Sequence, residues 1–472
     1  MKHTWSQYRS FDTTVRLLLI NQLTINLGFY MLMPYLAAHL SGRLALATWT
    51  VGLILGVRNL SQQGMFLIGG MLADRLGHKP LIVVGCTLRT VGFAALAFAE
   101  SLPALIAASA ATGLAGALFN PAVRAYLAAE ARERRVDAFA LFNVFYQTGI
   151  LLGPLLGLAL TSVSFPLTCA VASALFAALT LLQLRRLPEN AATELNDRPA
   201  LREQAGTVLR NRPFWLFALA MTGSYVLSFQ VYLALPLETQ RLTGDGAPAT
   251  TATSALFVVS GLVALIGQLR ITAWCKRTWT PARCLTAGTA IMGAAFLPPL
   301  LTADYPQAEH SWTVALAVTP LLLCAGLLAV ATAVLYPFEM DTIVSLAGGR
   351  WVATHYGLYN TVCGIGITLG NLATGALLDT ARNAGHPALP WLILALAGGG
   401  CAAALAALSR TGRLTTTEPV PAPGRPHADA AGPPSANHPS HGNTRTIASR
   451  PTPCSLRSSV DPKGDRHGRG DR

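Results

Sequence analysis

Residues 70–80 read GMLADRLGHKP, and this polar stretch stands between two long apolar segments. Gly77 permits the tight turn that two antiparallel helices need between them. The carboxylate of Asp74 is placed to neutralise the positive end of an adjacent helix, or to pair with Arg75 or Lys79. A short polar turn that joins two apolar helices is typical of a chain that crosses a membrane more than once.

The composition extends this interpretation to the whole chain. Of its 472 residues, 52% are apolar and only 12% are charged, whereas about 25% are charged in soluble domains. So few charges cannot cover the surface of a soluble protein, and so much apolar surface excludes disorder for most of the chain. The net charge of +13 is not gathered on a basic face with aromatic residues, so nucleic-acid binding is not favoured. The solvent of this protein is therefore predicted to be lipid.

Twelve membrane spans are predicted. A membrane-crossing helix needs about 20 mostly apolar residues, and charge-free windows of that length recur along the chain. Two more spans, 48–71 and 80–99, contain one arginine each. The window 138–184 is long enough for two spans. The charge-free windows are 17–42, 101–123, 138–184, 213–237, 246–269, 284–303, 311–338, 351–378 and 383–409.

Lysine and arginine mark one side of the membrane. When the segments outside the spans are assigned alternately to the two sides, 20 of these cations fall on one side, Arg124 among them, and three fall on the other. Cytoplasmic loops carry the excess of lysine and arginine, so both termini and residues 70–80 are predicted to be cytoplasmic. The chain is predicted to be a multi-pass protein of the cell membrane, surrounded by lipid. The three cations of the other side are Arg43, Arg241 and Arg382.

A long polar segment at 185–212 divides the spans into two sets of six. This arrangement predicts an all-α integral membrane protein with an N-terminal six-helix lobe at 1–184 and a C-terminal six-helix lobe at 213–409, which a cytoplasmic loop connects. Residues 410–472 are rich in Pro, Gly and Ser. They have too little apolar surface to fold, so they are predicted to form a disordered cytoplasmic tail.

The two sets of spans look like diverged copies of one another. The pattern Tyr-x3-Pro occurs in span 1 at 30–34 and in span 7 at 232–236. A residue pair ending in proline is predicted to close span 4 at 120–121 and span 10 at 336–337. Internal repeats of this kind build transporters whose substrate site lies between the two copies, near the middle of the membrane.

The stretch at 70–80 resembles the signature loop of the major facilitator superfamily. This resemblance implies the twelve-helix fold of that family, with two six-helix lobes, and a role for the loop in gating between the lobes. The residues that match the signature pattern and would serve that role are Gly70, Asp74, Arg75, Gly77 and Lys79.

A second motif lies in span 5, where Gly149, Gly153, Pro154 and Gly157 follow one another at helical spacing. Small residues at this spacing open one face of a helix, and the proline adds a bend. The motif resembles the antiporter motif of the exporter branches of the superfamily, which implies a helix that seals or hinges between the lobes. A generic packing face of small residues is the alternative interpretation.

Three further stretches, at 56–64, 88–93 and 387–391, resemble bacterial multidrug resistance efflux proteins of the MdtH type, in the twelve-span drug:proton antiporter branch. The resemblance implies export of small amphipathic compounds, driven by the proton gradient and without a cofactor. Two positions depart from the pattern. Asn21 stands in span 1 where such relatives place an acid, and Ser109 stands in span 4 where many exporters carry an arginine. The usual proton pathway of the branch is therefore incomplete.

The leading proton-coupling candidates are Glu339 and Asp341, which lie just after Pro337, near the cytoplasmic end of span 10. Acids are scarce in the other spans, so these two are selected by elimination. They are two residues apart on a helix, so they point in different directions and only one needs to face a cavity. Arg58 is a candidate counter-charge. The alternative is that both acids belong to a structural network at a helix end.

Arg58 and Arg89 lie near the middle of their spans. An arginine at that depth costs about 2.5–3.5 kcal/mol on insertion scales. Each is therefore expected to have a partner or to face a water-lined cavity. For both residues, a role in transport or gating and a role in structural pairing are open.

Polar and aromatic side chains on spans 1 and 7 are candidates for the substrate path, because those spans line the central path in the superfamily. Aromatic and amide groups on an apolar wall suit amphipathic ligands, although packing explains the same residues. The candidates are Asn21, Asn26, Tyr30, Tyr225, Ser228 and Tyr232.

Two other functions stay open at this point. A facilitator or symporter that imports a small nutrient would use the same fold, but the antiporter-like span 5 argues against it. A polytopic lipid-modifying enzyme needs acids and histidines that converge at membrane depth, and the histidines fall at span ends, in loops or in the tail. The eight cysteines form no CxxC pair, so no metal site is predicted. We expect a monomeric transporter, not an enzyme, whose partners are a small molecule and protons.

Overall fold

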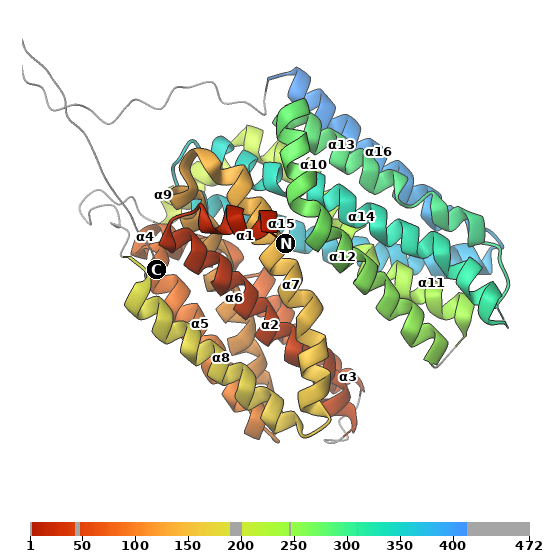
Figure 1. Cartoon of the computed structure of the whole chain (residues 1–472), viewed down its shortest axis with the longest axis horizontal. Coiled ribbons are helices and arrows are strands. Elements are labelled where there is room, and N and C mark those ends of the chain that lie inside the picture. Colours follow the sequence, from red (N-terminus) through yellow and green to blue (C-terminus); the bar gives the residue numbers. More distant parts are fainter. Residues whose placement is uncertain (1, 43–47, 189–200, 245–246, 309, 413–472) are drawn as a thin grey trace, which may run out of the picture. The chain divides into compact units, whose positions relative to one another are not determined.

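The part of the chain that the structure describes contains helices and no strand (Figure 1). Contacts gather residues 1–418 into one compact unit, so the division into two lobes at 185–212 stays a prediction. The predicted disordered tail lies outside the described residues from position 413 onward. The computed structural model describes residues 2–42, 48–188, 201–244, 247–308 and 310–412.

The first six predicted spans are all present as helices. A short helix, α1, precedes them, and the second span consists of two helices, α3 and α4. The bounds are α1 (Lys2–Arg9), α2 (Thr13–Gly42), α3 (Thr48–Gln63), α4 (Phe66–Leu76), α5 (His78–Phe98), α6 (Leu102–Ala131), α7 (Arg135–Thr161) and α8 (Phe165–Arg186).

The last six predicted spans are also helical. The helix α9 lies inside the segment that was predicted as a loop, and the seventh span combines α10, the 3₁₀ turn η3 and α11. The bounds are α9 (Leu201–Leu209), α10 (Arg212–Phe229), η3 (Gln230–Tyr232), α11 (Ala234–Thr243), α12 (Ala247–Thr278), α13 (Pro281–Ala294), η4 (Pro298–Thr302), α14 (Ser311–Leu346), α15 (Val352–Asn383) and α16 (Leu389–Arg410).

Ten segments of the described residues are long and apolar enough to cross a membrane. One of them, Leu102–Thr161, contains both α6 and α7. The predicted second span is not among the ten because a turn at residues 64 and 65 interrupts it, which leaves α3 with 16 residues and α4 with 11. The segment of two helices and the interrupted span together bring the total to twelve, so the predicted twelve spans and the all-α fold are confirmed.

Two predicted span ends are wrong. Pro121 and Pro337 do not end their helices, because α6 continues to Ala131 and α14 to Leu346. A proline removes one helical hydrogen bond, and membrane helices tolerate this loss where neighbouring helices pack around the bend. The consequence is that Arg124, which we had assigned to a loop, lies inside a helix.

The glycines of the antiporter-like motif bring α7 against α2. A Cβ atom added at Gly149 would lie 2.7 Å from the Cβ of Asn26, and one added at Gly153 would lie 2.7 Å from the Cβ of Tyr30. At Gly157 it would meet the carbonyl oxygen of Met31. These glycines therefore allow close packing within the first six spans, while α7 also contacts α12 and α14 of the last six.

Candidate functional site

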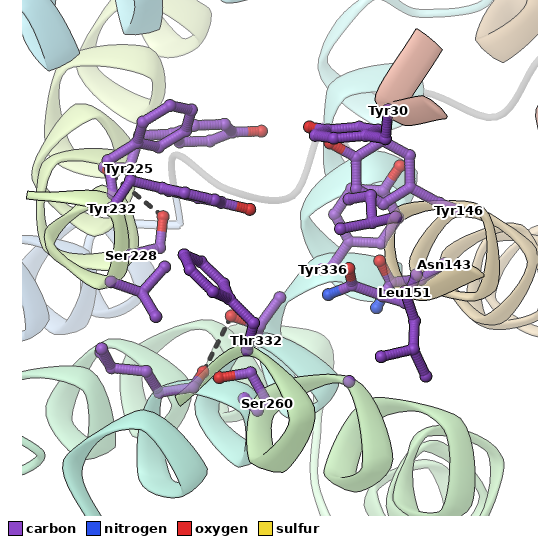
Figure 2. A pocket seen from close by; sticks show the side chains of 18 of the residues that line it. Tyr30, Asn143, Tyr146, Leu151, Tyr225, Ser228, Tyr232, Ser260, Thr332 and Tyr336 are labelled. Atoms are coloured by element: carbon purple, nitrogen blue, oxygen red, sulfur yellow. Dashed lines mark hydrogen bonds between the residues drawn. The ribbon is translucent and has the colours of Figure 1, made fainter. Parts of the chain in front are cut away.

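A cavity of about 640 Å³ lies between helices of the first six spans and helices of the last six. Its wall is formed by α2, α6 and α7 on one side and by α10, η3, α12, α13 and α14 on the other. Tyr30 and Tyr146 face Tyr225 and Tyr232 across the cavity (Figure 2). An apolar wall with a few convergent polar groups at this size suits a small amphipathic compound.

Glu339 is the acid of this cavity. It lies on α14, lines the cavity and is 2% exposed. Its Oε1 atom accepts a hydrogen bond of 2.8 Å from the hydroxyl of Tyr225 and one of 2.7 Å from the hydroxyl of Tyr359. Because Tyr225 also lines the cavity, a compound that contacts this tyrosine acts directly on the hydrogen bonds of the carboxylate.

Asp341, the second proton-coupling candidate, lies away from the cavity. Its Oδ1 forms an ion pair of 2.7 Å with Nε of Arg135 at the start of α7. Both side chains keep part of their surface exposed. The two acids therefore point in different directions, as their spacing predicts, and Glu339 is the one that faces the cavity.

Arg124 is the cation of the cavity, and the sequence analysis missed it. Its guanidinium lies beside Tyr336, Tyr225 and Tyr146. It forms no ion pair with any described residue, and its buried Nε has no hydrogen-bond partner. Arg124 also acts electrostatically on Glu339. Arg124 follows Asn120-Pro121 closely in the sequence. A helix that is expected to continue through Pro121 would place this arginine inside span 4.

Arg58, which we had considered as the counter-charge of Glu339, is not close to that acid. It donates hydrogen bonds to Asn59 over 3.0 Å and to Gln62 over 3.3 Å. Its guanidinium carbon lies 4.5 Å from the centre of the Phe29 ring, which is a cation–π distance. Arg124, and not Arg58, is therefore the arginine whose position allows it to act as the counter-charge of Glu339.

Arg89 is also outside the cavity. It is 4% exposed and lies over two aromatic rings, at 5.4 Å from Phe29 and at 5.6 Å from Phe176. Arg58 and Arg89 thus stack on the same phenylalanine from two different helices. The contacts that the structure shows for both arginines lie within the first six spans.

Four of the six candidates for the substrate path line the cavity, namely Tyr30, Tyr225, Ser228 and Tyr232. The other two, Asn21 and Asn26, do not. Asn21 accepts a hydrogen bond of 2.6 Å from Gln183, and Asn26 donates one of 2.7 Å to the carbonyl of Gln22. They occupy faces of α2 that turn into the first six spans. Lining residues that the sequence analysis missed include Asn143, Tyr146, Phe257 and Tyr336.

At one end of the cavity-forming helices, Asp74 binds the first turn of α15. It accepts hydrogen bonds from the backbone N–H of Ala353 over 3.0 Å and of Thr354 over 2.7 Å. The hydroxyl of Thr354 donates a third, over 2.6 Å. Burial raises the pKa of Asp74, and these hydrogen bonds act in the opposite direction. Of the two roles considered for this carboxylate, the structure shows the contact with a helix N-terminus.

Further contacts join the two sets of spans at the same end. Gln204 of α9 donates to the hydroxyl of Thr354 over 2.7 Å. Lys276 at the end of α12 pairs with Asp137 at the start of α7 over 2.8 Å. The pair of Arg135 and Asp341 also belongs to this end. These contacts hold the two sets of spans together at the end at which residues 70–80 lie.

The comparison with known families decides the identity of this fold. The model of the Major Facilitator Superfamily matches residues 18–371. The chain belongs to the major facilitator superfamily. Members of this superfamily are transporters, so this major facilitator protein is a multi-pass membrane transporter of small molecules and not an enzyme.

Curated relatives of this transporter cover most of its length. An uncharacterised transporter of the superfamily from Mycobacterium tuberculosis is 53% identical over 391 residues, which are 83% of this chain and 92% of the relative. The multidrug resistance protein MdtH of Klebsiella pneumoniae is 30% identical over 81% of this chain and 90% of the relative. The resemblance that the sequence motifs indicated is therefore confirmed.

Solved structures show the same fold at low sequence identity. The human organic anion transporter MFSD10 superposes with a TM-score of 0.64 at 16% identity, over 83% of this chain and 98% of that chain. An auto-inhibited peptide transporter of the POT family gives 0.62 at 17% identity, over 87% and 99%. At this identity the likeness concerns the arrangement of the helices alone.

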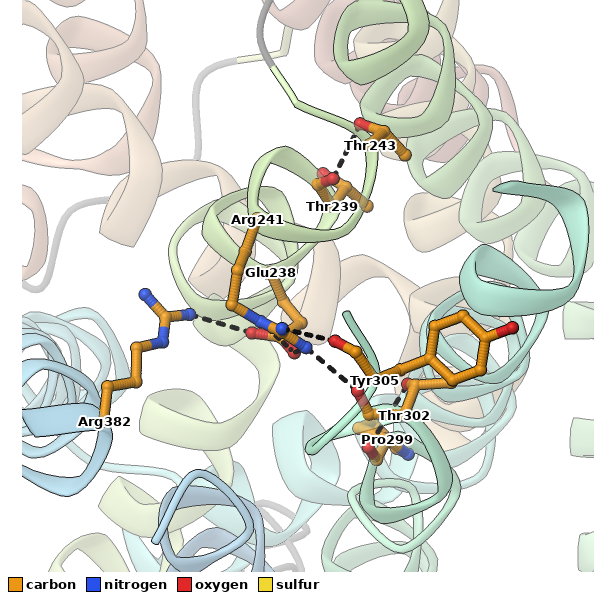
Figure 3. A network of polar contacts seen from close by, with 8 residues as sticks. All are labelled: Glu238, Thr239, Arg241, Thr243, Pro299, Thr302, Tyr305 and Arg382. Atoms are coloured by element: carbon orange, nitrogen blue, oxygen red, sulfur yellow. Dashed lines mark hydrogen bonds and ion pairs between the residues drawn. The ribbon is translucent and has the colours of Figure 1, made fainter. Parts of the chain in front are cut away.

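At the other end of this major facilitator transporter, a carboxylate binds two arginines (Figure 3). Glu238 of α11 is 2% exposed and accepts from Nη2 of Arg241 over 2.7 Å and from Nη2 of Arg382 over 2.8 Å. Arg241 also donates to the carbonyl oxygens of Tyr305 and Thr302, over 2.8 and 2.9 Å. The network ties α11 to the end of α15 and to the segment around η4.

We expect Glu238→Ala to destabilise the transporter. Breaking a fully buried ion pair costs about 3–5 kcal/mol. The two arginines here are about a quarter to a third exposed, so we expect a smaller loss, roughly 2 kcal/mol. Thermal unfolding of the purified protein in detergent measures it as a lower Tm. Glu203→Ala, at an exposed position of α9, is the matched control, and equal Tm values for the two variants would contradict the prediction.

We expect Gly70→Ala to lower transport several-fold at normal abundance. A Cβ atom at Gly70 would meet the carbonyl oxygen of Ala353, so α4 and α15 could no longer approach and the closed end would be disfavoured. The measurement is efflux from cells normalised to protein in the membrane. Gly375→Ala, where an added Cβ meets nothing within 4 Å, should behave as wild type. Equal efflux by both variants would show that this close approach is dispensable.

Proposed function

We propose that this transporter exports small amphipathic compounds by proton antiport through alternating access. The observation that carries the proposal is the position of Glu339, a buried carboxylate on the wall of the tyrosine-lined cavity. The 30% identity to a multidrug resistance protein supports the substrate class and the direction. The antiporter-like glycines of α7 support the same branch of the superfamily.

Glu339 is the group that carries the proton when the transporter exchanges a proton for a compound. One oxygen of the carboxylate accepts two tyrosine hydroxyls, and the other is available to carry the proton. A compound in the cavity that contacts Tyr225 changes the hydrogen bonds of the acid and favours release of the proton. Arg124, the cation of the same cavity, stabilises the carboxylate once the proton has left. Proton and compound then compete for one site, which is the requirement for antiport.

The contacts of Asp74 stabilise one of the two states that the cycle needs. We propose that they close the end at which residues 70–80 lie, and that the cavity is accessible from the opposite end in this state. A compound or a proton shifts the balance by binding one state better than the other. The excess of lysine and arginine supports a cytoplasmic position for the closed end, and we propose that both termini lie there, at the bacterial inner membrane.

Reporter fusions test this orientation. We expect fusions at the N-terminus, near residue 75 and near residue 200 to report the cytoplasm, because 19 of the 22 cations that remain once Arg124 is assigned to α6 lie on that side. A fusion near residue 300, between α13 and α14, should report the other side. A periplasmic signal from the fusion near residue 200 would overturn the proposed topology.

Everted membrane vesicles test the function. The vesicles are mixed with a panel of fluorescent amphipathic compounds in the outer solution, with and without an imposed pH gradient. We expect accumulation of some compounds that requires the gradient and stops when a protonophore collapses it. If no compound accumulates, the export proposal fails. Gradient-driven uptake of a nutrient into right-side-out vesicles would favour the alternative, a symporter that imports a small nutrient.

A further inference from the structure

The substrate cavity contains two opposite charges that do not pair with each other. Among the described residues that line it, only Arg124 and Glu339 are charged. Arg124 acts electrostatically on Glu339, and Tyr225 lies beside both groups. The ion pairs between described residues nevertheless do not include a pair of Arg124 and Glu339. A guanidinium and a carboxylate therefore stand apart on the wall of one cavity, which has a volume of about 640 Å³.

Arg124 keeps donor groups that no described residue uses. A guanidinium carries several N–H groups, and the hydroxyl of Tyr336 accepts a hydrogen bond from this one. The buried Nε of Arg124 has no hydrogen-bond partner. The side chain also borders the cavity, so a molecule in the cavity can reach it. A cation with unused donors at membrane depth is stabilised by an acidic group on that molecule.

Glu339 offers the opposite charge. Its Oε1 accepts the hydroxyls of Tyr225 and Tyr359, whereas its Oε2 accepts a hydrogen bond from no other described residue. Tyrosine rings stand around the cavity (Figure 2), and aromatic faces attract a cation. An ammonium group at Oε2 takes the position of the proton. The ammonium and the proton therefore exclude each other, as antiport requires.

The charges of a compound decide whether it can exchange with a proton at this site. A compound with only an amine would pair with Glu339, but Arg124 would repel it and stay unpaired. A compound with only an acid would pair with Arg124, and its negative charge would favour the protonated form of Glu339. Acid and proton would then bind together, which opposes antiport. A compound with both groups satisfies both residues and still displaces the proton.

We propose that Arg124 and Glu339 form a two-pole site for amphipathic compounds that carry both an acidic group and a basic amine. The inference rests on the proposed proton antiport and adds the class of compound to it. The ammonium binds Glu339, the acidic group binds Arg124, and the apolar body lies against the aromatic wall. A carboxylate suits Arg124, because guanidinium and carboxylate are planar and form paired, charge-assisted hydrogen bonds. The cavity volume lies in the range of sites for small organic compounds, about 300–1,000 Å³.

Matched fluorescent probes test the two-pole site in everted vesicles that contain the full-length transporter. Dansyl-lysine carries both charges, its methyl ester keeps only the amine, and its Nε-acetyl derivative keeps only the acid. Vesicles without the transporter measure passive trapping of the amines, and this background is subtracted. We expect a KM for dansyl-lysine that is about tenfold lower than the KM of the ester. The acetyl derivative should not accumulate in response to the pH gradient.

The outcomes separate this inference from the export proposal. Equal KM values for dansyl-lysine and its ester, or gradient-driven accumulation of the acetyl derivative, would overturn the two-pole site and leave export standing. The same holds if none of the three probes accumulates while other compounds of the panel do. If the pH gradient drives accumulation of no compound at all, the export proposal fails and this inference fails with it.

Variants assign the preference to Arg124. Arg124→Gln removes the charge and should make the two KM values equal, and the ratio within one variant is independent of its abundance. Arg124→Lys keeps the charge without the planar fork and should keep part of the preference. Arg277→Gln removes an exposed cation at the end of α12 and should keep all of it. An undiminished preference in Arg124→Gln would overturn the site. If that variant does not fold, the three probes in the wild type decide.

Discussion

In Glu339→Gln, pH-driven efflux is expected to fall to the background level while binding of the compound persists. The amide has the shape of the protonated acid and can still accept hydrogen bonds from Tyr225 and Tyr359, which now contact Oε1. It cannot release a proton, so the cycle loses the step that couples the compound to the gradient. Because a protonated acid competes with the compound, we expect weaker binding, but the variant should still exchange compound for compound.

Two assays in the same vesicles measure this result. The first follows accumulation of a fluorescent compound after a pH gradient is imposed, and the second follows exchange of labelled for unlabelled compound without a gradient. Asp341→Asn is the matched control, because it makes the same change two residues away in an acid that pairs with Arg135 outside the cavity. We expect this control to retain gradient-driven accumulation. Continued accumulation by Glu339→Gln would show that coupling uses another residue or does not use a proton.

For Asp74→Asn we expect a loss of transport of about tenfold at normal abundance. The carboxylate accepts three hydrogen bonds, and one oxygen of an amide can no longer accept. A hydrogen bond to a charged group contributes about 1.5–3 kcal/mol, and about 1.4 kcal/mol is a factor of ten in an equilibrium. The state that is closed at the loop of residues 70–80 would therefore become about tenfold less populated relative to the other.

The measurement combines efflux with labelling of single cysteines placed on the cavity wall. The variant should be expressed at wild-type levels and show increased labelling from the side of the 70–80 loop. Asp137→Asn is the comparison, because its partner Lys276 is 40% exposed and an exposed ion pair contributes about 0–1 kcal/mol. Normal efflux and normal labelling for Asp74→Asn would show that the contacts of Asp74 do not stabilise the closed state.

The sequence predicted the parts of the site that depend on local spacing. A contact of Asp74 with a neighbouring helix was one of two predicted roles, because a carboxylate is stabilised at a helix N-terminus. The different directions of Glu339 and Asp341 followed from two positions of separation on a helix. Neither argument needed to know which helix would be the neighbour.

The partners of these residues could not be predicted in this way. Asp74 binds residue 354, far away in the chain, and nothing in the signature loop names that position. Arg124 was assigned to a loop because a proline preceded it, although packing carries α6 through Pro121. The rotation of α2 about its own axis could not be predicted either. The helix places Tyr30 on the cavity wall and turns Asn21 and Asn26 away from the cavity.

By itself the sequence determined the solvent, the number of spans and the family, because hydropathy, charge asymmetry and short motifs are properties of contiguous residues. Only the tertiary structure decided which side chains meet. It placed Glu339 between two tyrosines of α10 and α15, gave the cavity its cation in Arg124, and stacked Arg58 and Arg89 on one ring. The physical reason is that a lipid-embedded helix can bury any of its faces against a neighbour. The rotation of each helix is therefore set by packing against its neighbours and not by its own sequence pattern.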